Sequence, residues 1–271
     1  MDLGLEGKVA LVTGGSMGIG SAMARSFARE GARVAICARG KERLEQVAHD
    51  VMDDTGGEVL PVVADITSEA ESESFVRTAF DHFGRVDILV NNAGDVGGTV
   101  GKTPQGHFMG FDDERWATTF AIKFYGNVHT IRAVIPYMID QGQGGRIIGI
   151  TGNRFKYPRD RMMSVGPVNA AFTNLMKSLA DDLAPYRILC NCVCPSSVTT
   201  HRRVEQNRNT AEREGISLDE AERRRNAEQF LGRSATPDEV ADVVVFLASE
   251  RAAYVSGTTI FVDGNEQRSA F

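Results

Sequence analysis

The feature that most constrains the fold is the alternation of short β-branched runs with longer amphipathic stretches along the chain. Such runs are typical of buried strands, and the stretches between them repeat apolar residues at helical spacing. Parallel strands need a crossover on one face of the sheet. The sequence therefore predicts an α/β fold, a doubly wound parallel sheet of seven strands flanked by helices. Strands are expected at 8–13, 33–38, 59–64, 86–90, 146–151, 188–193 and 258–262, and helices at 19–30, 41–54, 69–83, 113–141, 165–184 and 237–249.

Length and composition predict one domain over residues 1–271. The chain has 42% apolar residues, enough for a sizeable core, and shows no repeat or interdomain linker. A formal net charge of -6 argues against a nucleic-acid partner, whose phosphates attract clustered Lys and Arg. No run of 18 apolar residues occurs, and the first residues lack the pattern of a signal peptide. We therefore expect a cytoplasmic protein without a membrane partner.

The four cysteines fit a reducing compartment. Cys190, Cys192 and Cys194 alternate along one predicted strand, a spacing that sets their side chains in a row rather than in a tetrahedral cage. We interpret them as small core residues. The histidines are scattered, and the sequence predicts no metal site.

A glycine-rich turn is the first candidate for a functional site. Residues 13 to 20 read Thr-Gly-Gly-Ser-Met-Gly-Ile-Gly, between the first predicted strand and the first predicted helix. Backbone N–H groups and the positive end of the helix would point at one place, which suits a pyrophosphate. Gly14 allows the tight turn, Gly18 a close approach of the ligand, and Gly20 close packing of helix and strand.

Further motifs follow the carboxyl ends of other predicted strands. Asp65 follows the third, Asn91-Asn92-Ala93-Gly94 the fourth, and Pro195-Ser196-Ser197-Val198-Thr199-Thr200 the sixth. Together with the glycine turn, from about Leu5 to Gly264, they resemble the short-chain dehydrogenase/reductase family. The resemblance implies a Rossmann-type fold that binds a nicotinamide dinucleotide. By position it implies cofactor contacts from Gly14, Ser16, Gly18, Ile19, Gly20, Asp65, Ile66, Asn91, Ala93, Gly94, Pro195, Val198 and Thr200.

The end of the second predicted strand bears on which dinucleotide is bound. NAD enzymes typically place an acidic residue there to accept from the ribose 2′-hydroxyl, whereas this chain has Ala38 followed by Arg39. A guanidinium can pair with a 2′-phosphate. Met17 stands at the turn position where many NADP-binding members of the family carry a second basic residue. We expect NADP(H) to be preferred over NAD(H).

The resemblance fails at the residues that would carry the chemistry. The family protonates the substrate oxygen from a Tyr, aided by a Lys one helical turn later, a Ser after the preceding strand and an Asn on the preceding long helix. In an ungapped comparison these positions hold Val165, Asn169, Gly152 and Lys123. Valine cannot donate a proton. The usual proton-transfer groups are predicted to be absent as a set.

Several residues are candidates to replace them, each with a plainer alternative. Lys123 could face the vacated space as an acid or a ribose ligand, or else reach solvent or a subunit contact. Tyr157 could act as a substitute acid or pack against a lid. Thr151 could partly replace the serine hydroxyl. Asn153 and Asn169 could hydrogen-bond a substrate or the ribose.

Three function classes stay open. The favoured one is an NADP(H)-dependent oxidoreductase that acts on a carbonyl or hydroxyl group of a small molecule. The others are a non-redox isomerase, cyclase or lyase with NADP as scaffold, and a catalytically silent NADP-binding protein. The irregular stretches 95–110 and 201–232 are expected to form lids or pocket walls, with a substrate segment at about 196–232. Within the second stretch, Ser217 is expected to cap a short helix ahead of 222–226. The two long helices predicted at 113–141 and 165–184 suggest a homodimer or homotetramer.

Overall fold

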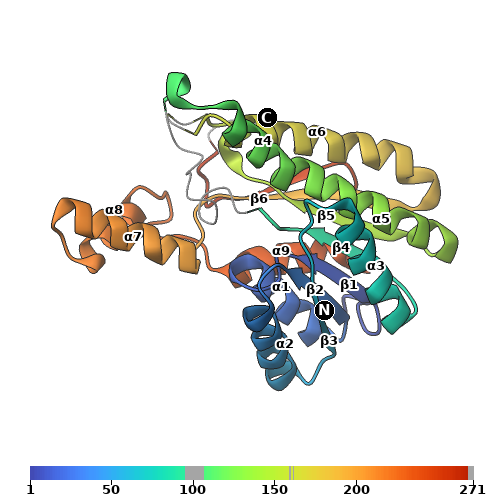
Figure 1. Ribbon diagram of the computed structural model, residues 1–271. Coiled ribbons are helices and arrows are strands. Elements are labelled where there is room, and N and C mark those ends of the chain that lie inside the picture. Colours follow the sequence, from blue (N-terminus) through green and yellow to red (C-terminus); the bar gives the residue numbers. More distant parts are fainter. Residues whose placement is uncertain (95–106, 159, 161, 268–271) are drawn as a thin grey trace.

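The protein is built on one parallel sheet, which confirms the predicted fold class. The structure, a computed structural model, describes residues 1–94, 107–158, 160 and 162–267. Within these residues seven strands pair in the order β3-β2-β1-β4-β5-β6-β7 (Figure 1). The strands are β1 (Val9–Thr13), β2 (Arg33–Ala38), β3 (Val59–Val63), β4 (Ile88–Asn91), β5 (Gly145–Ile150), β6 (Ile188–Pro195) and β7 (Thr259–Val262).

Helices connect the strands and cover both faces of the sheet (Figure 1). The predicted ends agree with the structure to within about two residues, apart from the segments 113–141 and 201–232. The α-helices are α1 (Gly18–Arg29), α2 (Lys41–Thr55), α3 (Glu69–Phe83), α4 (Asp113–Phe120), α5 (Gly126–Gln141), α6 (Val165–Leu183), α7 (His201–Glu214), α8 (Leu218–Ala227) and α9 (Pro237–Ala248).

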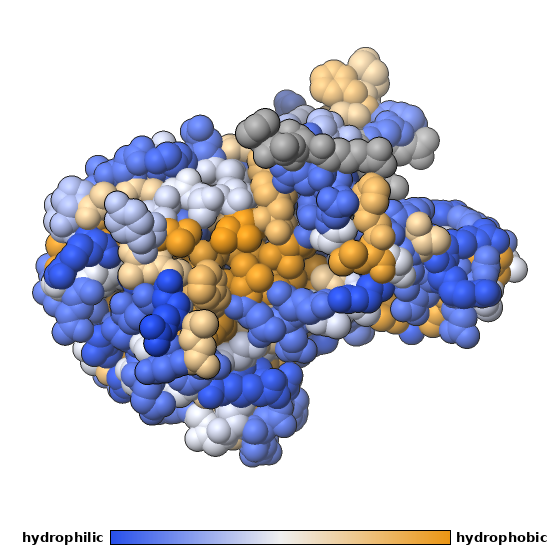
Figure 2. Space-filling view, turned by 180° about the vertical axis from the view of Figure 1, so that it is seen from behind, coloured by the Kyte–Doolittle hydropathy of each residue, from blue (hydrophilic) through white to orange (hydrophobic). Residues whose placement is uncertain are grey.

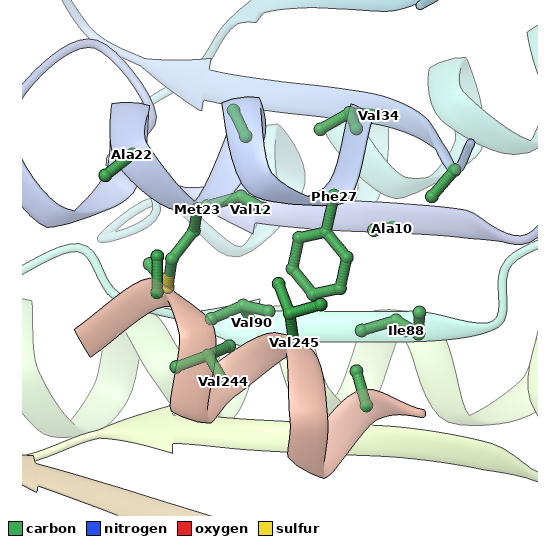
Figure 3. Close-up of a cluster of buried hydrophobic side chains, with 14 of the residues drawn as sticks. Ala10, Val12, Ala22, Met23, Phe27, Val34, Ile88, Val90, Val244 and Val245 are labelled. Carbon is green, nitrogen blue, oxygen red and sulfur yellow. The ribbon is translucent and has the colours of Figure 1, made fainter. Parts of the chain in front are cut away.

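The core has two layers because side chains of a strand alternate between the faces of the sheet. On one face α1, α2 and α9 pack over the strands, and on the other α3, α5 and α6 do so. Figure 3 shows the first layer, where Phe27 and Met23 of α1 face Val244 and Val245 of α9. Cys190, Cys192 and Cys194 are buried in β6, as predicted for small core residues.

The order of the strands fixes where a ligand can bind. The chain goes from β1 outward to β2 and β3 and then returns to β4 on the other side of β1. The helices that follow β1 and β4 therefore lie on opposite faces, which leaves a crevice at the carboxyl ends of these two strands. The glycine turn after β1 and the Asn91-Asn92-Ala93-Gly94 motif after β4 both lie at this crevice.

The segment 201–232 differs from the prediction, because most of it is helical. It forms α7 and α8, which project from the body of the molecule as an arm (Figure 1). Its charged residues lie on solvated helix faces, and without a long apolar stripe the sequence did not predict α7 or the full length of α8. The predicted cap is confirmed, since the Ser217 side chain accepts from the N–H of Glu220 at the start of α8.

Candidate active site

The glycine turn has the conformation that an anion site requires. Gly14 and Gly18 have φ angles of +68° and +57°, which favour glycine. A Cβ atom on Gly20 would lie 2.1 Å from the carbonyl oxygen of Gly14, so only glycine lets α1 approach the turn. Met17 caps α1 without a side-chain acceptor, and the first turn has no acidic residue. The first N–H groups of α1 and its positive end therefore fit a pyrophosphate.

Hydrogen bonds join this turn to the end of β4. The Thr13 hydroxyl accepts from the N–H groups of Asn92 and Ala93, both at 3.0 Å. The Asn92 amide donates to the carbonyl oxygens of Thr13 and Gly14, at 2.9 and 3.3 Å. These bonds hold Ala93 and the following Gly94 beside the turn. Ser16 and Ile19, which were also predicted to contact the cofactor, lie in the turn itself and are partly buried.

Residues at the ends of β2 and β3 form the next part of the crevice. Arg39 directly follows β2, and its guanidinium lies 4.0 Å from the carboxylate of Asp65, which follows β3. The same carboxylate accepts from the N–H and the hydroxyl of Thr67. Ile66 is buried, and its side chain lies 2.8 Å from where a Cβ on Gly126 would be. A cation thus stands at the end of β2, where a 2′-phosphate would be recognised.

The segment after β6 closes the crevice from the side of α7. Pro195 ends β6, and Val198 forms a β-bridge with Ala235. Thr200 caps α7, and its methyl group lies 3.3 Å from where a Cβ on Gly18 would be. The segments that follow β1 and β6, which hold predicted cofactor residues, therefore approach each other here.

Lys123 is presented by a distortion of the helix predicted over 113–141. Residues Ala121–Tyr125 form a π-helical turn between α4 and α5, a feature frequent at functional sites. The Asn127 amide donates to the carbonyl oxygen of Lys123 at 2.9 Å. The buried Asn91 side chain donates to the carbonyl oxygen of Asn127 and accepts from Thr130. Both ends of the Asn91 amide are thus engaged by α5, so its predicted contact with the cofactor stays a prediction.

The structure brings Lys123 to the residue that replaces the expected lysine. Its Nζ donates to Oδ1 of Asn169 on α6 at 3.3 Å. Its Cε lies 2.5 Å from where a Cβ on Gly94 would be, so the side chain lies against Gly94, shortly after β4. Of the two positions suggested for Lys123, the structure shows the one that faces the site.

Burial, together with the positive charge of Arg202 on α7, lowers the pKa of the Lys123 ammonium to about 8. Cys194 is close by, but its thiol stays protonated because burial raises its pKa to about 12. A lysine with a pKa near neutrality can both give and take a proton, which an ordinary surface lysine does poorly.

Asn169 has an amide group without a full set of partners. Its side chain is 2% exposed, and its Nδ2 donates to no acceptor among the described residues. A Cβ on Gly152 would lie 3.1 Å from this nitrogen, so the absence of a side chain at Gly152 leaves room beside it. Val165, one turn earlier on α6, is buried and offers no polar group.

The remaining candidates lie elsewhere around the end of β5. The hydroxyl of Thr151 is 3.3 Å from that of Thr173 on α6, so it faces the helix, and a contact with substrate would need a rotation of this side chain. The N–H of Tyr157 donates to the carbonyl oxygen of Asn153, and the Tyr157 side chain is partly buried. Their catalytic roles stay predictions.

Glu266, after β7, is a site residue that sequence reasoning missed. Its carboxylate accepts from the Asn153 amide at 2.8 Å, pairs with Arg154 at 3.4 Å, and accepts from the Ser196 hydroxyl. It therefore links the segments that follow β5, β6 and β7. Its position shortly after a strand was the available signal, because the carboxyl ends of all parallel strands meet at one edge of the sheet.

Most of the stretch 95–110, expected to form a lid or pocket wall, lies outside the described residues. Within the described part of the chain, no group of three His, Cys, Asp or Glu residues could hold a metal ion, and no helix is long and apolar enough to cross a membrane.

The fold and the crevice define a Rossmann-type dinucleotide-binding protein, and comparisons with known proteins specify the family. Residues 14–264 match a family model described as enoyl-(acyl carrier protein) reductase. The chain is 34% identical to L-rhamnose 1-dehydrogenase (NAD(P)(+)) of Azotobacter vinelandii, over 95% of each chain. It is 31% identical to a 3-oxoacyl-[acyl-carrier-protein] reductase of Thermotoga maritima, over 96% of this chain and 98% of that one.

A solved structure agrees with these relatives. L-Sorbose reductase from Gluconobacter frateurii, in complex with NADPH and L-sorbose, matches with a TM-score of 0.93 and 32% identity, over 99% of this chain and 100% of that one. The chain belongs to the short-chain dehydrogenase/reductase family, as its motifs predicted. These relatives are oxidoreductases, and a nicotinamide cofactor is named for the rhamnose dehydrogenase and the sorbose reductase.

Proposed function

We propose that the protein is an NADP(H)-dependent oxidoreductase that interconverts a carbonyl and a hydroxyl group, with Lys123 as the proton donor in a non-standard active site. The observation that carries this proposal is the position of the Lys123 ammonium between Gly94 and Asn169, at the carboxyl end of β4. When bound, the nicotinamide ring supplies or accepts the hydride.

Lys123 supplies what Val165 cannot. In the reducing direction its ammonium donates a proton to the oxygen of the former carbonyl group and becomes an amine. In the oxidising direction the amine removes the proton of the hydroxyl group. A pKa of about 8 suits both tasks, because a general acid or base works best when its pKa is near the operating pH.

The preference for NADP(H) rests on Arg39. The expected result of Arg39→Ala is a loss of NADPH affinity by about 10- to 100-fold, because hydrogen bonds to charged groups contribute ~1.5 to 3 kcal/mol. The affinity for NADH should change by less than about threefold, since NADH lacks the 2′-phosphate. Fluorescence titration with each cofactor measures the two affinities. Lys41→Ala, at the nearby start of α2, is the control and should leave the ratio of the two affinities unchanged. Equal losses for both cofactors with Arg39→Ala would refute the preference.

We propose a polyhydroxylated sugar as substrate class, because an L-rhamnose dehydrogenase and an L-sorbose reductase are among the proteins similar to this chain. The test follows NADPH absorbance with L-sorbose and a panel of ketoses and simple ketones, and NADP⁺ reduction with L-rhamnose and related aldoses. Turnover with at least one compound, abolished in Lys123→Met but with NADPH binding retained, is expected. Tight NADPH binding without turnover of any compound would refute the proposal and favour a non-redox or silent protein.

We propose that residues 1–271 act as one cofactor-binding unit, with the segment 196–232 facing the substrate. We further propose that the protein is cytoplasmic, since its four cysteines are free, and that it assembles as a homodimer or homotetramer.

A further inference from the structure

We propose that Nδ2 of Asn169 is the hydrogen-bond donor that binds the reacting oxygen of the substrate, and that Gly152 is required because it leaves room for that oxygen. This inference deepens the proposed function and rests on it. It assigns to one amide the orientation of the substrate, while Lys123 delivers the proton.

The orientation of the Asn169 amide follows from its contact with Lys123. An ammonium group only donates hydrogen bonds, so the atom 3.3 Å from Lys123 Nζ must be the amide oxygen. The amide nitrogen then points to the other side, toward Gly152. Lys123 thus fixes which end of the amide faces the gap.

The free donor requires an acceptor. A buried polar group left without a hydrogen bond costs about 1 to 3 kcal/mol, so such groups in native proteins usually bind water or a ligand. Asn169 Nδ2 has no acceptor among the described residues, although its side chain is 2% exposed. The group that completes this site must be an acceptor, and the oxygen of a carbonyl or hydroxyl group is one.

The space for this acceptor exists because residue 152 is glycine. A Cβ at this position would lie 3.1 Å from Asn169 Nδ2, closer than side-chain carbons usually approach. Any side chain on residue 152 would therefore enter the gap and crowd the amide nitrogen. The glycine and the unpartnered amide are two parts of one binding site.

The two donors act on one atom at different stages. The reacting oxygen, bound by Asn169 Nδ2, and the Lys123 ammonium contact the two ends of one amide. As hydride arrives at the carbonyl carbon, the C=O π electrons move to the oxygen. The amide N–H stabilises this developing charge, and Lys123 transfers one proton to it, which leaves an alcohol and a neutral amine.

The test of this inference compares Gly152→Ser and Asn169→Asp with a control, Asn174→Asp, which makes the second of these changes at an exposed position of α6. The substrate is the compound with the highest turnover in the panel above. In Gly152→Ser the new hydroxyl fills the gap and accepts from Asn169 Nδ2. We expect kcat to fall at least about 10-fold, and by about 10²- to 10³-fold in Asn169→Asp, the usual loss for one such donor. Asn174→Asp should keep wild-type kcat, and NADPH affinity should change less than threefold in Gly152→Ser.

A second measurement does not depend on turnover. The side-chain amide signal of Asn169 in ¹⁵N-labelled protein, identified by its loss in Asn169→Asp, should shift when the alcohol product is added to the NADP⁺ complex. The same addition to Gly152→Ser should leave it in place. Unchanged or increased kcat in Gly152→Ser, or an Asn169 signal that the alcohol does not move, would overturn this inference while the oxidoreductase stands. No turnover in the wild type would instead overturn the proposed function.

Discussion

At the residue scale, the site depends on a pair of side chains rather than on either alone. Lys123 needs a hydrogen-bond acceptor because a partly buried cation without one is costly, and Asn169 provides it. Asn169 in turn is oriented by the cation. Lys123, in the π-helical turn before α5, and Asn169, on α6, thus hold each other's side chains in place.

The pKa of Lys123 predicts how catalysis depends on pH. The protonated form of Lys123 prevails below its pKa of about 8 and is lost above it. The rate of carbonyl reduction should therefore fall as the pH rises through about 8, and the rate of alcohol oxidation should rise over the same range. Measurements of kcat against pH in both directions test this.

A variant separates Lys123 from other titrating groups. Lys123→Arg keeps the positive charge but cannot release a proton in this range, because the guanidinium pKa exceeds about 12. The pH profile of its residual activity should therefore show no change of slope near pH 8. A change of slope near pH 8 that persists in Lys123→Arg would assign the titration to another group.

At the scale of elements, helix packing holds the cofactor turn in place. The α1 helix, whose first residue belongs to the glycine turn, packs on α9 through Phe27, which is fully buried (Figure 3). The Thr236 capping box fixes the start of α9: its side chain accepts from the N–H of Glu239, and the Glu239 carboxylate accepts from that of Thr236. The direction of α1, and hence of its N-terminal N–H groups, thus depends on a distant helix.

Removal of this contact should cost stability. We expect Phe27→Ala to lower the free energy of unfolding by about 3 to 5 kcal/mol, because a buried phenyl ring leaves a cavity when truncated. Denaturant unfolding followed by circular dichroism measures the change. Phe108→Ala makes the same truncation at a side chain that is 67% exposed, and should change the free energy by less than about 1 kcal/mol. Equal effects of both variants would contradict the proposed packing role.

At the scale of the whole molecule, two features of the surface support the proposed self-association. The strand β7 lies at the edge of the sheet, and all four of its residues are only partly buried. Figure 2 shows an apolar area in the middle of one face, surrounded by hydrophilic residues. Apolar areas of this kind on soluble proteins commonly mark sites of protein–protein contact.

We expect the mass in solution to be twice or four times the 29.4 kDa of one chain. Light scattering coupled to size-exclusion chromatography measures this mass directly. The assembly should persist on dilution to micromolar concentrations, because an apolar interface of standard size supports affinities in this range or better. A mass of about one chain across the dilution series would refute the proposed assembly.

The sequence by itself determined the parallel sheet, the positions of nearly all its strands and helices, the family and the glycine turn. These follow from local patterns: the period of apolar residues, the glycines that a tight turn demands, and the identity of side chains at strand ends. The sequence also showed that the expected catalytic residues are replaced, because the residue type alone tells which functional group is absent. The replacing residues are Val165, Gly152, Asn169 and Lys123.

Only the tertiary structure decided what stands in their place. The Lys123–Asn169 contact joins residues 46 positions apart, and its geometry depends on the π-helical turn of Ala121–Tyr125, which no local pattern announced. The hydrogen bond between Glu266 and Asn153 likewise joins residues that are far apart in the sequence, by 113 positions. The helix α7 was missed, and only the start of α8 was predicted, because their residues are charged on nearly all sides. Contacts between distant segments depend on packing, and the free donor of Asn169 appears only when every neighbour is in place.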